Sequence, residues 1–241
     1  MKKPNLYLSA DSKCGLGHVR RLQALEWAWG EPANWERSDI PEVPGICVVD
    51  DYYYTEQSFQ KWKDAGHLVA YFTEFPCNFA VDIIINQNFG ADKLRYDVPV
   101  KLLGTSYFML RQNYLTVKSY GHGAIFDADS VNRKLTPLEF TQTMAESRAI
   151  ICSAGLTAYE ALYLEKPLLL RMVAENQSRT YHGLIDNGYA VPYNDENKEK
   201  LKWGWLPTLK SGRSLVDGRG PLRVVKALEM AWENKQSTAS G

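Results

Sequence analysis

A glycine-rich turn near the N-terminus places a histidine where the chain could do chemistry. Gly15, Gly17 and His18 lie in SADSKCGLGHVRR, between a predicted strand and a predicted helix. Such a turn points unpaired backbone N–H groups at a ligand, and the start of the helix favours negative charge. We therefore expect both glycines to bring the backbone close to an anionic ligand, with His18 and Arg20 facing it. The alternative is a tight turn that His18 only caps.

A second strand-to-helix turn, CSAGLTAYEAL at residues 152–162, carries Ser153, Gly155 and Thr157. Two hydroxyl groups beside the N–H groups of a helix start are again suited to an anion. Glu160 follows within about one turn, where its carboxylate could reach the hydroxyls of a ribose. The alternative for Glu160 is an exposed residue that interacts favourably with the helix dipole.

Three further segments offer polar side chains near predicted strand ends. Asp50 ends the strand GICVVDD and either faces a ligand or caps the next helix. Asn176 and Gln177 follow the strand PLLLRM, and their amides suit a sugar or a base edge unless they form an ordinary polar loop. Tyr107 and Arg111 in GTSYFMLR either contact a ligand from a segment between domains or simply pack and pair.

The elements that must position these residues alternate between strand and helix. Apolar runs predict strands, and helical spacing or capping residues predict helices. The expected strands span 5–10, 45–51, 67–72, 81–88, 100–104, 122–128, 149–155 and 167–172, and the expected helices 18–30, 55–66, 136–147, 156–166 and 219–235. This alternation indicates an α/β fold with parallel sheets and helical crossovers.

We expect two Rossmann-like domains that face each other across a cleft. Residues 1–107 would form the N-terminal domain with His18, and residues 108–241 a C-terminal nucleotide-binding domain. Open α/β sheets bind ligands beyond the carboxyl ends of their strands, which is where the two glycine-containing turns are expected to lie.

The composition restricts the partners. The chain has 241 residues, 45% of them hydrophobic, and its 28 Lys and Arg balance its 28 Asp and Glu. A basic surplus that would indicate nucleic acid or an anionic membrane is lacking. Cys14, Cys47, Cys77 and Cys152 show no CxxC pair or zinc-ligand spacing, which predicts a reducing compartment and no metal site. We expect no cofactor either.

The N-terminal segment MKKPNLYLSADSK contains only a short apolar stretch, too short for a signal peptide or a membrane span. We therefore expect a soluble cytoplasmic protein, and we favour a monomer.

Taken in order, several segments resemble one family. These are GLGHVRR, VVDDY, DIIINQN, LLGTSYFMLR, SAGLTAYEALYLEKP, ENQ and VDGRGPLRVVKAL, and the matches run from residue 9 to about residue 228. The set is similar to the PseG/SpsG family, the UDP-sugar hydrolases of pseudaminic acid biosynthesis. The resemblance implies a glycosyltransferase-B-like (GT-B-like) fold, in which two Rossmann-like domains flank a nucleotide-sugar cleft. Residues 112–148 lack the family's Gly-Gly-x-Asp strand end, so we expect a shortened second domain.

The resemblance also implies roles for individual residues. His18 would be the general base on a water that attacks the anomeric carbon, with UDP as the leaving group. The substrate would be a UDP-acetamido-deoxy sugar, of the UDP-2,4-diacetamido-2,4,6-trideoxyhexose type, used for a nonulosonic acid or another surface glycan. The implied contacts are Gly15 and Gly17 near the sugar and diphosphate, Ser153, Gly155 and Thr157 at the diphosphate, Glu160 at the ribose, Asn176 and Gln177 at the sugar or phosphate, and Tyr107 and Arg111 between the domains.

Two alternatives remain open. A glycosyltransferase of the same fold would pass the sugar to an acceptor, which requires an open or membrane-facing groove. The chain has no basic amphipathic helix with exposed aromatic residues to provide one. The other alternative is a non-catalytic nucleotide-sugar-binding or partner protein, which would have little use for a base at His18.

Overall fold

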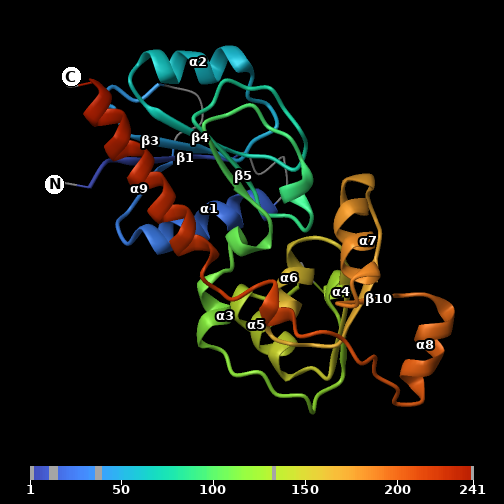
Figure 1. Ribbon diagram of the computed structural model, residues 1–241. Helices are drawn as coiled ribbons and strands as arrows, with labels where there is room; N and C mark the ends of the chain where they lie inside the picture. The colour runs from blue at the N-terminus through green and yellow to red at the C-terminus, as the bar shows by residue number, and fades with distance from the viewer. Residues whose placement is uncertain (1–2, 11–15, 36–39, 132–133, 240–241) are drawn as a thin grey trace. The chain divides into compact units, whose positions relative to one another are not determined.

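The computed structural model describes residues 3–10, 16–35, 40–131 and 134–239, which form two compact units (Figure 1). Unit 1 comprises the chain up to Arg111 together with the chain from Arg219 onward, and unit 2 comprises Gln112–Gly218. Each unit is built around one sheet whose strand pairs are all parallel. The prediction of an α/β fold with two Rossmann-like domains, the second smaller, is confirmed.

Unit 1 holds a six-stranded sheet in the order β2-β1-β3-β4-β5-β6. Its strands are β1 (Leu6–Ser9), β2 (Asn34–Trp35), β3 (Ile46–Val49), β4 (Leu68–Phe72), β5 (Ile83–Asn86) and β6 (Val100–Leu103). The four strands in the middle are buried along their whole length. Their continuous apolar runs are typical of parallel strands covered on both faces.

Helices cover both faces of this sheet. On one face, α1 (Leu16–Trp29) and α9 (Gly220–Ala239) lie side by side and bury Leu22, Leu25 and Leu228 against the strands. On the other face, α2 (Glu56–Asp64) buries Phe59 and Trp62. Thr55 caps the N-terminus of α2, as the sequence predicts, because its hydroxyl accepts a hydrogen bond from the backbone N–H of Ser58.

The position of α9 differs from the predicted domain division. That division assigned all of residues 108–241 to the second domain, whereas α9 packs on α1 in unit 1. The start of α9 is tightly placed, because a Cβ added at Gly220 would lie 2.1 Å from the carbonyl oxygen of Phe108. The chain therefore passes from unit 1 into unit 2 and back again. An amphipathic pattern predicts a helix but does not say which sheet the helix will cover.

Unit 2 holds a four-stranded sheet in the order β10-β9-β8-β7. Its strands are β7 (Ile125–Asp127), β8 (Ala149–Ser153), β9 (Leu168–Arg171) and β10 (Val191–Pro192). Its helices are α3 (Gln112–Thr116), α4 (Ala128–Val131), α5 (Pro137–Glu146), α6 (Leu156–Tyr163), α7 (Ser178–Asp186) and α8 (Asp195–Lys202). Short 3₁₀ turns complete the two units at η2 (Ala91–Lys93), η3 (Thr105–Tyr107), η4 (Glu175–Gln177) and η5 (Gly212–Ser214).

Local signals account well for α5 and poorly for the elements after β9. Thr136, Pro137 and Glu139 form the start of the helix expected over 136–147, with a complete capping box. The sequence analysis predicted no element between residues 173 and 218, where α7, β10 and α8 lie. On the sheet, α8 packs Leu201 against one face, and the Phe140 ring of α5 contacts Phe126. Among the described residues, no helix combines the length and the apolar character needed to cross a membrane.

Candidate functional site

The strand order of unit 1 reverses at β1, which has β2 on one side and β3 on the other. The chain leaves β1 into α1 on one face of the sheet and leaves β3 toward α2 on the opposite face. Connections that diverge in this way open a crevice beyond the carboxyl ends of the two strands, and doubly wound sheets bind their ligands there. The polar residues of this edge are therefore the first candidates for a site.

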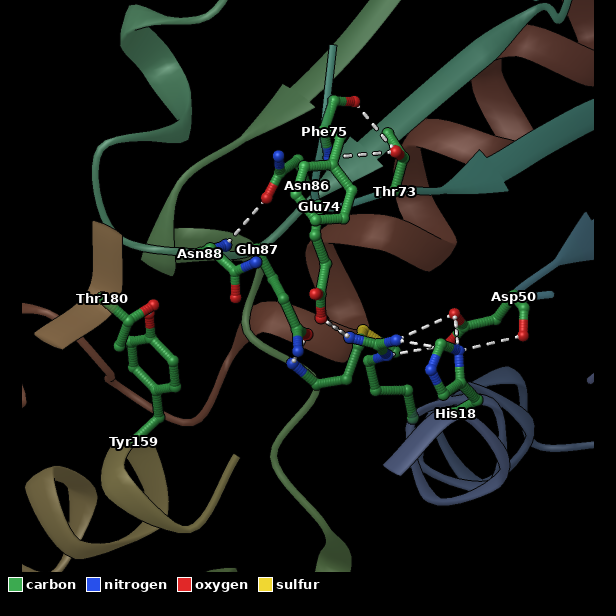
Figure 2. A network of polar contacts seen from close by, with 12 residues as sticks. His18, Asp50, Thr73, Glu74, Phe75, Asn86, Gln87, Asn88, Tyr159 and Thr180 are labelled. Carbon is green, nitrogen blue, oxygen red and sulfur yellow. Dashed lines mark hydrogen bonds and ion pairs between the residues drawn. The ribbon is translucent and has the colours of Figure 1, made fainter. Parts of the chain in front are cut away.

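His18 and Asp50 meet at this point (Figure 2). His18 lies in the first turn of α1 and is 6% exposed, and Asp50 follows β3 and is 1% exposed. The His18 Nδ1 lies 2.7 Å from Asp50 Oδ1 and 3.1 Å from the Asp50 carbonyl oxygen. Arg21 Nη2 also lies 3.1 Å from Nδ1, but it donates at the shorter distance of 2.8 Å to Asp50 Oδ1. Because both Asp50 oxygens only accept hydrogen bonds, Nδ1 carries the proton of the neutral ring and donates to them. The Nε2 atom then holds the lone pair and is the basic atom of the ring.

Arg21 holds the Asp50 carboxylate from the next turn of α1. Its Nε donates to Asp50 Oδ2 at 2.7 Å and its Nη2 to Oδ1 at 2.8 Å. Burial lowers the pKa of the guanidinium, but the attraction of Asp50 outweighs burial and raises that pKa above its usual value. Arg21 is therefore a permanent cation that compensates the buried carboxylate. Asp50 in turn is fixed as an acceptor for His18.

Glu74 and Tyr52 complete the network. Glu74 follows β4, and its Oε1 lies 3.4 Å from Arg21 Nη1. The Tyr52 ring meets the His18 ring edge-on, with centroids 4.8 Å apart. Burial and the neighbouring Glu74 raise the pKa of the Tyr52 hydroxyl, which therefore keeps its proton at neutral pH. With a neutral His18, one arginine and two carboxylates leave these groups with a formal charge of −1.

The structure brings only some of the residues predicted around His18 into this network. Gly15 lies outside the described residues, and Gly17 already belongs to the first turn of α1. Asp50 contacts His18 and Arg21, and it does not cap α2, whose cap is Thr55.

The other predicted residues of unit 1 lie on α1, at the end of η3 and at the end of the first segment of the unit. Arg20 is partly exposed on α1. Tyr107 ends η3 and packs on the core of unit 1. Arg111 is the last residue of unit 1 before the chain enters unit 2.

The sequence analysis missed Arg21 and chose its neighbour Arg20. A usable signal was present, because residues three apart lie on the same face of a helix. The spacing His18-x-x-Arg21 therefore places the second arginine, rather than the first, beside the histidine. Glu74 and Tyr52 carried no such local signal.

In unit 2, the predicted residues lie near the carboxyl ends of β8 and β9. Ser153 ends β8, Gly155 is the N-cap residue of α6, and Thr157 lies in the first turn of α6. The Ser153 hydroxyl donates to Asp129 Oδ1 at 3.2 Å. Asn176 and Gln177 form η4 after β9, where the Gln177 side-chain oxygen accepts a hydrogen bond from the backbone N–H of Val173.

Glu160 is not the exposed residue that one alternative described. It is 3% exposed, and its Oε2 accepts a hydrogen bond from the hydroxyl of Tyr114 at 2.9 Å. That contact ties α6 to α3 inside unit 2. The contact of Glu160 with a ribose stays a prediction.

A second network of charges lies at the carboxyl edge of unit 2 and was not predicted. Arg171 ends β9 and donates two hydrogen bonds, of 2.8 and 2.7 Å, to Asp127 at the end of β7. These bonds raise the pKa of the guanidinium. Asp129 lies 3.6 Å from Arg171 Nη1, and the guanidinium also stacks over the ring of Tyr193. One arginine and two carboxylates give this group a formal charge of −1 as well.

Comparison with protein-family models and with curated proteins matched this chain to none of them. Within the part of the chain that the structure describes, no group of three or more His, Cys, Asp or Glu residues could hold a metal ion. The chemistry available at the edge of unit 1 is that of a histidine base oriented by a compensated carboxylate.

Proposed function

We propose that this protein is a nucleotide-sugar hydrolase that releases UDP from a UDP-acetamido-deoxy sugar, with His18 as the general base. The observation that carries the proposal is the 2.7 Å contact between His18 Nδ1 and Asp50 Oδ1. It fixes the proton on Nδ1 and leaves Nε2 as the atom that accepts a proton. The strand reversal at β1 and the sequence resemblance to the PseG/SpsG family support the same assignment.

The proposed reaction is a displacement at the anomeric carbon. The oxygen of a water molecule forms a bond to this carbon while His18 Nε2 takes a proton from the water. The bond between the anomeric carbon and the phosphate oxygen breaks, and its electron pair leaves with UDP. Asp50 stabilises the imidazolium that results, as the acidic partner of a histidine base does in other hydrolases. General base catalysis of this kind contributes about 10²- to 10⁴-fold in rate.

The remaining assignments rest on the resemblance. Ser153, Gly155 and Thr157 would hold the diphosphate, and Asn176 with Gln177 the sugar or phosphate. Gly17, Arg20, Tyr107 and Arg111 would contact the substrate. The N-terminus of α6 supports the diphosphate assignment, because it presents backbone N–H groups that favour an anion.

The test is UDP release from a panel of UDP-acetamido sugars by the wild-type protein and by His18→Ala. We expect the wild type to yield UDP and free sugar, and the variant to lose about 10²-fold or more of the rate. His122→Ala is the matched control, because His122 is exposed and lies in unit 2, outside the network. This control should keep the wild-type rate.

Other outcomes separate the alternatives. Binding of an intact UDP sugar without UDP release would favour a glycosyltransferase that lacks its acceptor, or a binding protein. Adding candidate acceptors would distinguish these two, since only a transferase would then release UDP. The absence of both UDP release and ligand binding would overturn the proposal.

A further inference from the structure

Two neighbouring amides end β5 on the edge of the sheet that carries the His18 network. Asn86 is the last residue of β5 and Gln87 follows it, and each side chain is 1% exposed. Strand β5 pairs with β4, which leads into Glu74, so the polar groups after β1, β3, β4 and β5 lie along one edge. Buried amides at such a position need hydrogen-bond partners on both their oxygen and their nitrogen.

Asn86 has both partners within unit 1. Its Nδ2 donates to the hydroxyl of Tyr96 at 2.8 Å, and its Oδ1 accepts from the backbone N–H of Asn88 at 3.1 Å. This amide therefore shapes the end of β5 and has no need of a ligand.

Gln87 differs from its neighbour. The backbone N–H of Met109 donates to Gln87 Oε1 at 2.9 Å. Because the partner is a donor, the amide atom that faces it must be the oxygen, and the other amide atom is the NH₂ group. That Nε2 is buried and has no hydrogen-bond partner among the residues that the structure describes. Buried donors without an acceptor are rare in folded proteins, and each one calls for an explanation.

The surroundings of Gln87 indicate what its partner would be. Figure 2 shows the Gln87 side chain extending from the end of β5 on the side where Glu74, His18 and Asp50 lie. The carboxylates of Asp50 and Glu74 outnumber the one guanidinium of Arg21, which disfavours an anion in this region. An uncharged oxygen, such as a sugar hydroxyl or an amide carbonyl, is the acceptor that suits both the free donor and the local charge.

We propose that Gln87 is a specificity-determining residue whose Nε2 donates a hydrogen bond to an uncharged oxygen of the sugar bound beside His18. This inference rests on the proposed function and deepens it. The inference places the uncharged sugar of the substrate at the carboxyl edge of the unit 1 sheet. The Met109 contact fixes the amide orientation before the ligand arrives, so the donor is already aimed.

The experiment compares wild type with Gln87→Glu and Gln87→Met by calorimetry, using UDP and UDP-N-acetylglucosamine as probes. Gln87→Glu keeps the acceptor for Met109 and removes the NH₂ group, whereas Gln87→Met removes the donor without adding charge. We expect both variants to bind the UDP sugar about tenfold or more weakly and to bind UDP within about twofold of wild type. Thermal unfolding of each variant establishes that it is folded.

The outcomes are distinct for the two proposals. If the wild type binds the UDP sugar tightly and both variants bind it equally well, the role of Gln87 is overturned and the proposed function stands. If the wild type binds neither probe, the proposed function fails. The same three proteins are then titrated with N-acetylglucosamine and galactose. If the wild type binds one of these sugars and both variants lose that binding, Gln87 donates its hydrogen bond to a sugar that carries no nucleotide. If the wild type binds neither sugar, this role of Gln87 is overturned too.

Discussion

The carboxyl edges of the two sheets carry the same pair of residue types in different settings. In unit 1, Arg21 donates two hydrogen bonds to Asp50 at the point where the strand order reverses, and the two side chains are 6% and 2% exposed. In unit 2, Arg171 donates two hydrogen bonds to Asp127 on a sheet whose strands follow one another in chain order, and these side chains are 27% and 32% exposed. Among the described residues, only the first pair has a histidine bonded to it.

The role of an arginine–aspartate pair therefore depends on how deeply the pair is buried and on which further residue it contacts, which in unit 1 is His18. The buried pair in unit 1 fixes the proton of His18 and so prepares a base. The pair in unit 2 ties β9 to β7 in contact with solvent, where such pairs contribute little.

The largest expected effect comes from Asp50→Asn. The carboxylate oxygen that accepts from His18 Nδ1 becomes part of an amide whose NH₂ can face the ring instead, which favours the proton on Nε2. We expect UDP release to fall by about 10²-fold or more, measured at saturating substrate. Asp127→Asn in unit 2 is the matched control and should retain most of the rate. Equal losses in both variants would contradict the distinction between the two edges.

A direct comparison of stability follows from replacing each arginine by methionine. Arg21→Met leaves a buried carboxylate without its cation and should destabilise the protein by about 3–5 kcal/mol. Arg171→Met exposes its partners to water and should cost about 1 kcal/mol or less. Denaturant unfolding, followed separately for the two units by their tryptophans, measures both values. Similar costs would show that the difference in burial does not set the strength of the two pairs.

A smaller effect is expected for Asp129→Asn. The Asp129 carboxylate accepts from the Ser153 hydroxyl at the place where the diphosphate is proposed to bind. Removing this negative charge should tighten UDP binding by about two- to fivefold, in line with the strength of exposed charge interactions. Calorimetry with UDP at low and high salt is the measurement, and the gain should shrink at high salt. Weaker binding would mean that Asp129 orients Ser153 for the ligand.

Local signals predicted the elements of this protein better than they predicted its site. Thr55 and Thr136 mark helix starts because a cap depends on residues that are adjacent in the chain. The contact between His18 and Asp50 joins residues 32 positions apart. It depends on the pairing of β1 with β3, which places Ser9 opposite Val49 and Asp50 just beyond. Neither segment alone predicts that these two strands will pair.

The elements between residues 173 and 218 were missed for a different reason. The strand β10 has only two residues, and the helices α7 and α8 are short and largely polar. A strand of this length has too few residues to show alternation. Arg21 is the exception, because the spacing from His18 would have been sufficient to find it.

The return of α9 to unit 1 has a consequence for how the chain acquires its structure during synthesis. Unit 2 is an insertion, and all of its residues leave the ribosome before α9 does. The part of the unit 1 core that Val224 and Leu228 complete therefore stays open until α9 has been synthesised. Domains whose segments are continuous generally fold as units during translation. In this protein the inserted unit can complete its core first, and the half that carries His18 is completed last.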